Sequence, residues 1–105
     1  MPKATKAPTA TYRARHDGHA IAIRVVSRDG EYRISHTMRG LGRTPELTFS
    51  HELYAACSWH GMRVDAVRNC ILAQDPATAV EGFGRAQRLA EQYVAAIELL
   101  RKGGA

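Results

Sequence analysis

The fold is decided by residues 11–39, which read TYRARHDGHAIAIRVVSRDGEYRISHTMR. Two Asp-Gly dipeptides, at positions 17–18 and 29–30, interrupt an alternation of apolar and polar residues. Asp-Gly favours two-residue turns with positive φ, because the twist of these turns matches that of the flanking strands. The stretch therefore predicts a three-stranded antiparallel meander, with strands over Thr11–His16, His19–Arg28 and Glu31–Arg39.

The period of two assigns the side chains of this meander to two faces, provided that the strands pair in the register that two-residue turns impose. One face carries small residues and four arginines, which are Arg13, Arg15, Arg24 and Arg33, and it is predicted to face away from the core. The other face is mostly apolar and is predicted to pack on helices. It holds Tyr12, Ala14, Ile21, Ile23, Val25, Tyr32, Ile34 and Met38.

Helical patterns follow the meander. The first predicted helix covers Ser50–His60 and ends at Gly61, with an earlier start at Thr44 as the alternative. The second covers Val64–Ala73, and the third begins at the capping box of residues 78–81, Thr-Ala-Val-Glu. Strands segregated from helices indicate an α+β fold in the order β-β-β-α-α-α, with the helices packed on one face of the sheet.

The chain has 105 residues, which suits one small domain, and we expect that domain over residues 11–105 after a flexible basic tail over residues 1–10. Its formal net charge is +5, and 12 of its 15 cationic residues are Arg. The charge is uneven, since residues 1–43 carry +6 and the remainder −1. Arg binds phosphate and carboxylate with paired hydrogen bonds. A GC-rich coding sequence is the alternative explanation for the excess of Arg over Lys.

Residues 1–10, MPKATKAPTA, lack the apolar segment of a signal peptide, and no apolar run approaches the ~20 residues of a membrane span. The two cysteines, Cys57 and Cys70, are too few for a disulfide framework. These features lead us to expect a cytoplasmic protein with reduced thiols.

The four arginines of the sheet are the first candidate site. Guanidinium groups on a surface of small side chains suit a phosphate backbone, and the affinity would depend on salt. An acidic protein surface would suit them as well, and a solvated outer face is the purely structural interpretation. The face carries no aromatic residue, so base stacking is not expected.

The second candidate resembles a helix-turn-helix motif and covers residues 52–71. It has a small residue four positions before Gly61, an apolar residue after it and a valine six positions after it. The resemblance implies that Gly61 makes the turn and that Arg63, Arg68 and Asn69 face a major groove of DNA. Two packed helices joined at a glycine produce the same spacing without any contact to DNA.

Metal binding and catalysis have weaker patterns. Cys57-x-x-His60 has the spacing of metal ligands on one helix face, and His51 and Cys70 would complete a tetrahedral set. A second close pair of ligands is missing, so we expect no metal. Ser50, His51 and Glu52 are triad residue types, but consecutive residues on a helix point apart. We therefore expect neither enzymatic activity nor a cofactor.

The last predicted helix has an apolar seam at Phe83, Ala86, Ala90, Tyr93, Ile97 and Leu100. This seam can close the core of its own domain or form a homodimer. Taken together, the sequence predicts a small non-enzymatic binding protein with nucleic acid as the leading partner. The alternative is a protein–protein adaptor or inhibitor that binds an acidic surface.

Overall fold

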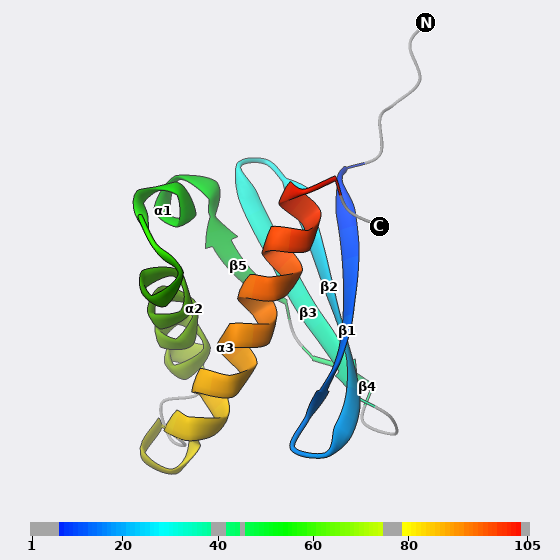
Figure 1. Cartoon of the computed structure of the whole chain (residues 1–105), viewed down its shortest axis with the longest axis vertical. Coiled ribbons are helices and arrows are strands. Elements are labelled where there is room, and N and C mark those ends of the chain that lie inside the picture. Colours follow the sequence, from blue (N-terminus) through cyan, green and yellow to red (C-terminus); the bar gives the residue numbers. More distant parts are fainter. Residues whose placement is uncertain (1–6, 39–41, 45, 75–78, 104–105) are drawn as a thin grey trace, which may run out of the picture.

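The computed structural model describes residues 7–38, 42–44, 46–74 and 79–103. It shows one antiparallel sheet with helices on one of its faces, in agreement with the predicted α+β class (Figure 1). The strands are β1 (Thr9–His16), β2 (His19–Arg28), β3 (Glu31–Met38), β4 (Gly42–Arg43) and β5 (Leu47–Ser50), and the helices are α1 (His51–Ala56), α2 (His60–Gln74) and α3 (Ala79–Arg101).

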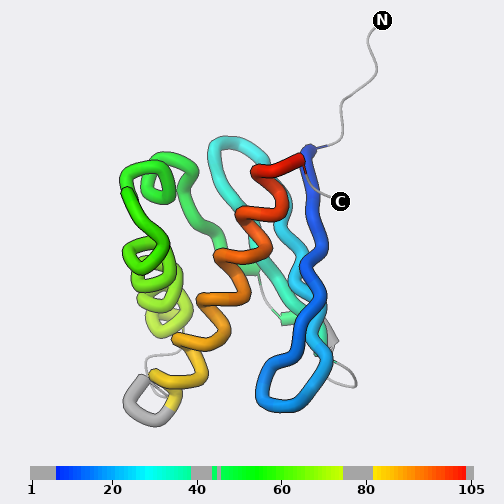
Figure 2. The backbone as a smooth tube through the Cα atoms, viewed as in Figure 1, coloured from blue at the N-terminus to red at the C-terminus, as the bar shows by residue number. Residues whose placement is uncertain are grey.

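The meander and its register are confirmed. Tyr12 lies opposite Ile23, and Val25 lies opposite Ile34, as in-register hairpins require. Both turns have positive φ at their two central residues, with 51° at Asp17 and 82° at Gly18 in the first. The two turns lie at opposite ends of the molecule (Figure 2). β1 begins at Thr9, so the last residues of the predicted tail belong to the sheet.

The sheet is larger than predicted, because β4 and β5 both pair with β3. β5 occupies the segment just before the predicted first helix, and it places Leu47 and Phe49 in the core. The helix itself starts only after Ser50, whose side chain accepts a hydrogen bond from the backbone N–H of Leu53 at 3.1 Å. The alternative helix start at Thr44 is therefore wrong.

The first predicted helix is also too long. α1 ends at Ala56, and the chain turns through residues 57–59 before α2 begins at His60. Gly61 thus lies in the first turn of α2 rather than between the helices. A Cβ atom at Gly61 would come within 2.5 Å of the indole of Trp59, so the glycine allows this ring to lie against the helix.

α3 crosses the apolar face of the sheet and contacts β1 and β2, while α2 packs beside it and contacts β5 (Figure 1). The core lies between these layers. Its largest fully buried side chains are Tyr54, Phe49, Ile23, Ile34, Ile97, Val25, Val67 and Val94. The seam of α3 is buried in this core except at Phe83, which is 49% exposed. The helix therefore closes its own domain, and a dimer through it stays a prediction.

Several predictions lie outside the described residues, including most of the tail and the capping interaction of Thr78 with Glu81. The described helices include none that is both long enough and apolar enough to cross a bilayer.

Candidate functional site

The outer face of the sheet, defined as the face turned away from the helices, carries an ordered row of arginines. In the observed register, five consecutive outward rungs of β1, β2 and β3 each hold one of them. We call this row the arginine ladder; from one end of the sheet to the other it consists of Arg15, Arg13, Arg24, Arg33 and Arg28. Outward rungs are separated by about 6.7 Å, which is the rise of two strand residues.

Arg28 is the member that the sequence analysis missed. It follows Arg24 at an even spacing on β2, so the alternation that identified the other four also places it on the outer face. It is the last residue before the second turn and lies opposite Glu31.

Two members of the ladder have partners within the protein. The guanidinium of Arg15 donates a hydrogen bond of 2.6 Å to the carbonyl oxygen of Gly18. Arg33 forms ion pairs with Asp29 at 3.3 Å and with Glu31 at 3.8 Å. These contacts tie both arginines to the hairpin turns and occupy part of their capacity to bind an anion.

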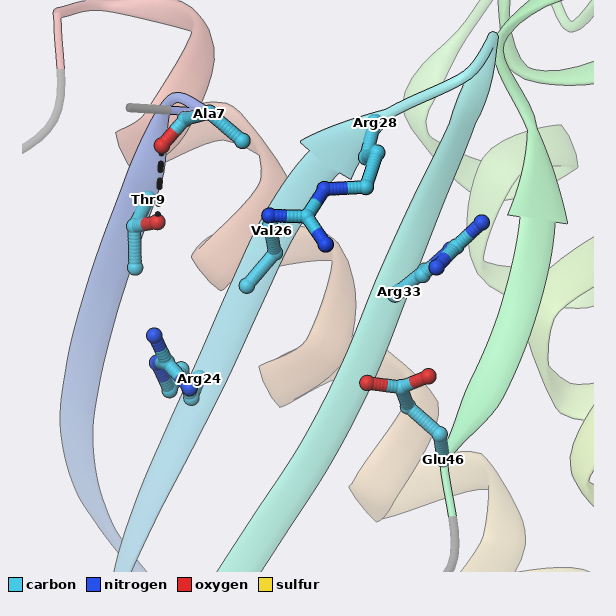
Figure 3. Close-up of a pocket in the computed structure, with 7 residues that line it drawn as sticks. All are labelled: Ala7, Thr9, Arg24, Val26, Arg28, Arg33 and Glu46. Atoms are coloured by element: carbon cyan, nitrogen blue, oxygen red, sulfur yellow. Dashed lines mark hydrogen bonds between the residues drawn. The ribbon is translucent and has the colours of Figure 1, made fainter. Parts of the chain in front are cut away.

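The other three members, Arg13, Arg24 and Arg28, are exposed, and none has an ion-pair partner among the residues that the structure describes. They line two adjacent depressions of about 720 and 240 Å³, which share Arg24. The larger depression is lined by Ala7, Thr9, Arg24, Val26, Arg28, Arg33 and Glu46 (Figure 3). The smaller is lined by Thr11, Arg13, Ala22, Arg24, Ser35, His36 and Thr37.

Guanidinium groups and hydroxyls make up most of the polar lining of these depressions. Figure 3 shows Arg24 and Arg28 projecting from β2 and Arg33 from β3, with Glu46 as the one acidic residue of the larger depression. Guanidinium and hydroxyl groups donate hydrogen bonds to phosphate or carboxylate oxygens. The arrangement is therefore suited to holding an anion.

The residues predicted to face a major groove have other contacts. Arg63 donates to the carbonyl oxygen of Cys57 at 3.2 Å and pairs with Glu98 at 3.5 Å. Arg68 pairs with Asp65 at 2.9 Å and donates to Gln87 at 2.8 Å.

Arg68 also lies 4.7 Å above the ring of Phe83 and donates to the side-chain oxygen of exposed Asn69. Arg63 and Arg68 thus connect α2 to α3 and to the α1–α2 corner. The geometry expected of the helix-turn-helix resemblance, with a glycine turn before the second helix, is absent because α2 already starts at His60.

The metal-ligand candidates are not brought together. Cys57 follows α1 and is buried, whereas His60 starts α2 and is exposed, so the two do not share a helix face. His51 forms a 2.9 Å hydrogen bond with Ser27, and its ring centroid lies 4.2 Å from that of Tyr32. Cys70 is partly buried on α2. No group of three or more potential ligands occurs within the described residues.

Two histidines, buried His16 and half-buried His36, lie between the sheet and α3. Nδ1 of His36 is 2.6 Å from the hydroxyl of Tyr93, and burial lowers the pKa of His36 below its ordinary value of 6.5, with a further contribution from His16. Burial also lowers the pKa of His16, although Asp17 opposes this effect. Burial raises the pKa of Tyr93 to about 12, so this hydroxyl stays protonated.

These shifts predict that the protein loses stability in mild acid. Below the ordinary histidine pKa of 6.5, the unfolded chain takes up protons that the folded chain does not. The free energy of unfolding should therefore fall as the pH decreases through this value, and the loss should level off below the folded pKa values. Urea unfolding between about pH 7.5 and pH 5 measures it.

His36→Gln should flatten this pH dependence in part, and the remainder should come from His16. A free energy of unfolding that stays constant over the whole pH range would contradict the assignment.

Comparison with models of protein families, with curated proteins and with solved structures finds no match for this chain.

Proposed function

We propose that the protein binds nucleic acid through the outer face of its sheet and contacts the phosphate backbone rather than the bases. The observation that carries the proposal is the arginine ladder, which supplies one cationic side chain on each of five consecutive outward rungs. A polyanion with regularly spaced charges can contact several of these side chains at once. Each phosphate neutralised by an arginine releases counterions, which favours binding.

The chemistry of the face supports backbone contacts. Around the ladder, the lining of the two depressions offers hydroxyls of Thr9, Thr11, Ser35 and Thr37, which are common phosphate ligands. Among the described residues, no Phe, Tyr or Trp lines either depression, and the ring of His36, which borders the smaller one, is hydrogen-bonded to Tyr93 of α3. Stacking on aromatic rings is the usual means by which sheet surfaces hold unstacked bases. Binding is therefore proposed to be independent of sequence.

The experiment is a fluorescence anisotropy titration with labelled DNA duplexes of unrelated sequence, repeated at several salt concentrations. We expect similar affinities for all duplexes and a linear fall of log K with log salt. If the three unpaired arginines each contact a phosphate, the slope should be about −2.7 or steeper, because each contact contributes roughly −0.9.

An acidic polypeptide such as polyglutamate is the comparison ligand. Failure to bind any duplex at low salt would reject the proposal. Tighter binding of the polypeptide than of duplex DNA would favour an acidic protein partner instead.

A further inference from the structure

β1 is the long free edge of the sheet. The strand order is β1-β2-β3-β4, with β5 also on β3, so among the described strands β1 has a neighbour on one side only (Figure 1). It is 8 residues long, and its outward-facing side chains at Thr9, Thr11, Arg13 and Arg15 are all exposed. An edge strand of this length offers a row of backbone groups to a further strand.

The register identifies which backbone groups of β1 point away from β2. In a hairpin with a two-residue turn, the flanking pair, here His16 and His19, exchanges both backbone hydrogen bonds, and bonded pairs then alternate with non-bonded ones. At the far end, the N–H of Ser27 donates to the carbonyl oxygen of Pro8 at 2.9 Å, which fits this alternation. The even-numbered residues of β1 therefore bond to β2, and the odd-numbered ones direct their N–H and C=O groups outward.

One end of this edge is closed. The side-chain amide of Gln92, on α3, donates a hydrogen bond to the carbonyl oxygen of Arg15. Within the part of the chain that the structure describes, no hydrogen bond reaches the backbone groups of Thr11 or Arg13. The open part of the edge is thus centred on Thr11.

We propose that a second copy of this chain adds to β1 in antiparallel orientation, about a two-fold axis at Thr11. Thr11 then pairs with Thr11 of the second copy, and Thr9 pairs with Arg13 in both directions. All these residues have outward backbone groups, so each pair exchanges both of its N–H···O=C bonds.

The side chains favour this register over its neighbours. With the axis at Thr11, threonine meets threonine on the outer face, and Arg13 meets Thr9 rather than another cation. On the helix-covered face, half-buried Tyr12 lies opposite Ala10 of the second copy. Moving the axis to Arg13 would place two arginines directly opposite each other, and it would bring the edge closed by Gln92 into the interface.

This dimer joins the two outer faces into one surface, on which the two arginine ladders are related by the axis. Their like charges oppose association, so both added salt and a bound polyanion should favour the dimer. By linkage, dimerisation should strengthen polyanion binding by the same factor. The dimer itself is independent of the proposed function, and only this coupling rests on it.

Sedimentation velocity of the full chain without nucleic acid, over a range of protein and salt concentrations, tests the dimer. We expect a concentration-dependent dimer that strengthens with salt. Thr11→Pro removes the outward N–H at the axis but no bond to β2. The dissociation constant of the dimer should therefore rise at least about tenfold, while the melting temperature stays close to that of the wild type. Thr11→Val keeps the N–H and should dimerise like the wild type.

A second variant gives a result that does not depend on how well Thr11→Pro folds. Hydrogen-bonded residues of antiparallel strands have Cα atoms about 5.5 Å apart, within the range that a disulfide spans. Thr11→Cys should therefore form an intermolecular disulfide under mild oxidation, whereas Thr48→Cys, exposed on β5, should not.

A chain that stays monomeric at every concentration and salt, or equal cross-linking of the two cysteine variants, would overturn the dimer. If the chain forms the dimer but does not bind duplex DNA, the result would contradict the proposed function and leave the dimer supported.

Discussion

Replacing Arg13, Arg24 and Arg28 together by glutamine should lower the affinity for duplex DNA at low salt at least about a hundredfold, since each charge-assisted contact contributes on the order of 1.5 kcal/mol or more. It should also flatten the dependence of log K on log salt by about 2.7. These arginines are exposed and have no ion-pair partner among the described residues, so the folded structure should not depend on them. Anisotropy titrations at several salt concentrations measure both effects.

The matched control removes the same charge from another surface. Arg85, Arg101 and Lys102 are exposed on α3 or directly after it, and their replacement by glutamine lowers the net charge equally. This variant should lose less than about tenfold in affinity, because only the long-range attraction changes. Equal losses in the two triple variants would show that net charge, rather than the outer face, governs binding.

Phe49→Ala should destabilise the protein by about 3–5 kcal/mol, the range for a large aromatic side chain removed from a core. Phe49 is 2% exposed and packs edge-on against Tyr54, with ring centroids 6.2 Å apart. A domain of this size has roughly 5–15 kcal/mol of stability in total, so the variant should be partly unfolded at moderate temperature. Urea unfolding followed by circular dichroism measures the change.

Thr48→Ala is the control for Phe49→Ala. Thr48 is the neighbouring residue of β5, lies opposite Arg33 on the outer face and is exposed. Its replacement should change the free energy of unfolding by no more than about 0.5 kcal/mol, as for most exposed positions. Similar losses at both positions would contradict the alternation of β5 and its place in the sheet.

The meander was predictable from the sequence because its signals are local. A two-residue turn with positive φ selects Asp-Gly, and the turn then sets the register of the strands on either side. The register in turn separates the core face from the arginine face. This is why strand ends and side-chain directions over residues 11–38 agree with the structure to within two residues.

The segment after the meander was predicted poorly because its structure depends on distant contacts. β5 has only Leu47 and Phe49 as an alternating signal, and it becomes a strand by pairing with β3. Between α1 and α2, Arg63 donates a hydrogen bond to the carbonyl oxygen of Cys57 and pairs with Glu98 of α3, a long-range contact that the local sequence does not indicate. The sequence pattern predicts Gly61 as a helix end, whereas in the structure Gly61 lies within α2 and leaves room for the indole ring of Trp59.

The candidate site was predictable as a face but not in its detail. Alternation placed Arg13, Arg15, Arg24 and Arg33 together, and the same rule extends to Arg28. Which of them are free to bind a ligand depends on side-chain contacts with the turns. Arg15 reaches Gly18, and Arg33 reaches Asp29, so the sequence overstated the availability of these two.

The division of the meander into two faces also determines which genetic changes the protein can tolerate. Neighbouring residues in β1 and β2 face opposite sides of the sheet, one the core and the other the outer face. The outer face can therefore acquire or lose charges by substitution while the core stays the same. Insertion or deletion of a single codon within one of these strands would exchange the layers, with Arg24 turned inward and Ile23 or Val25 turned toward solvent. Length variation in descendants of this gene should therefore be confined to the connections between strands and helices.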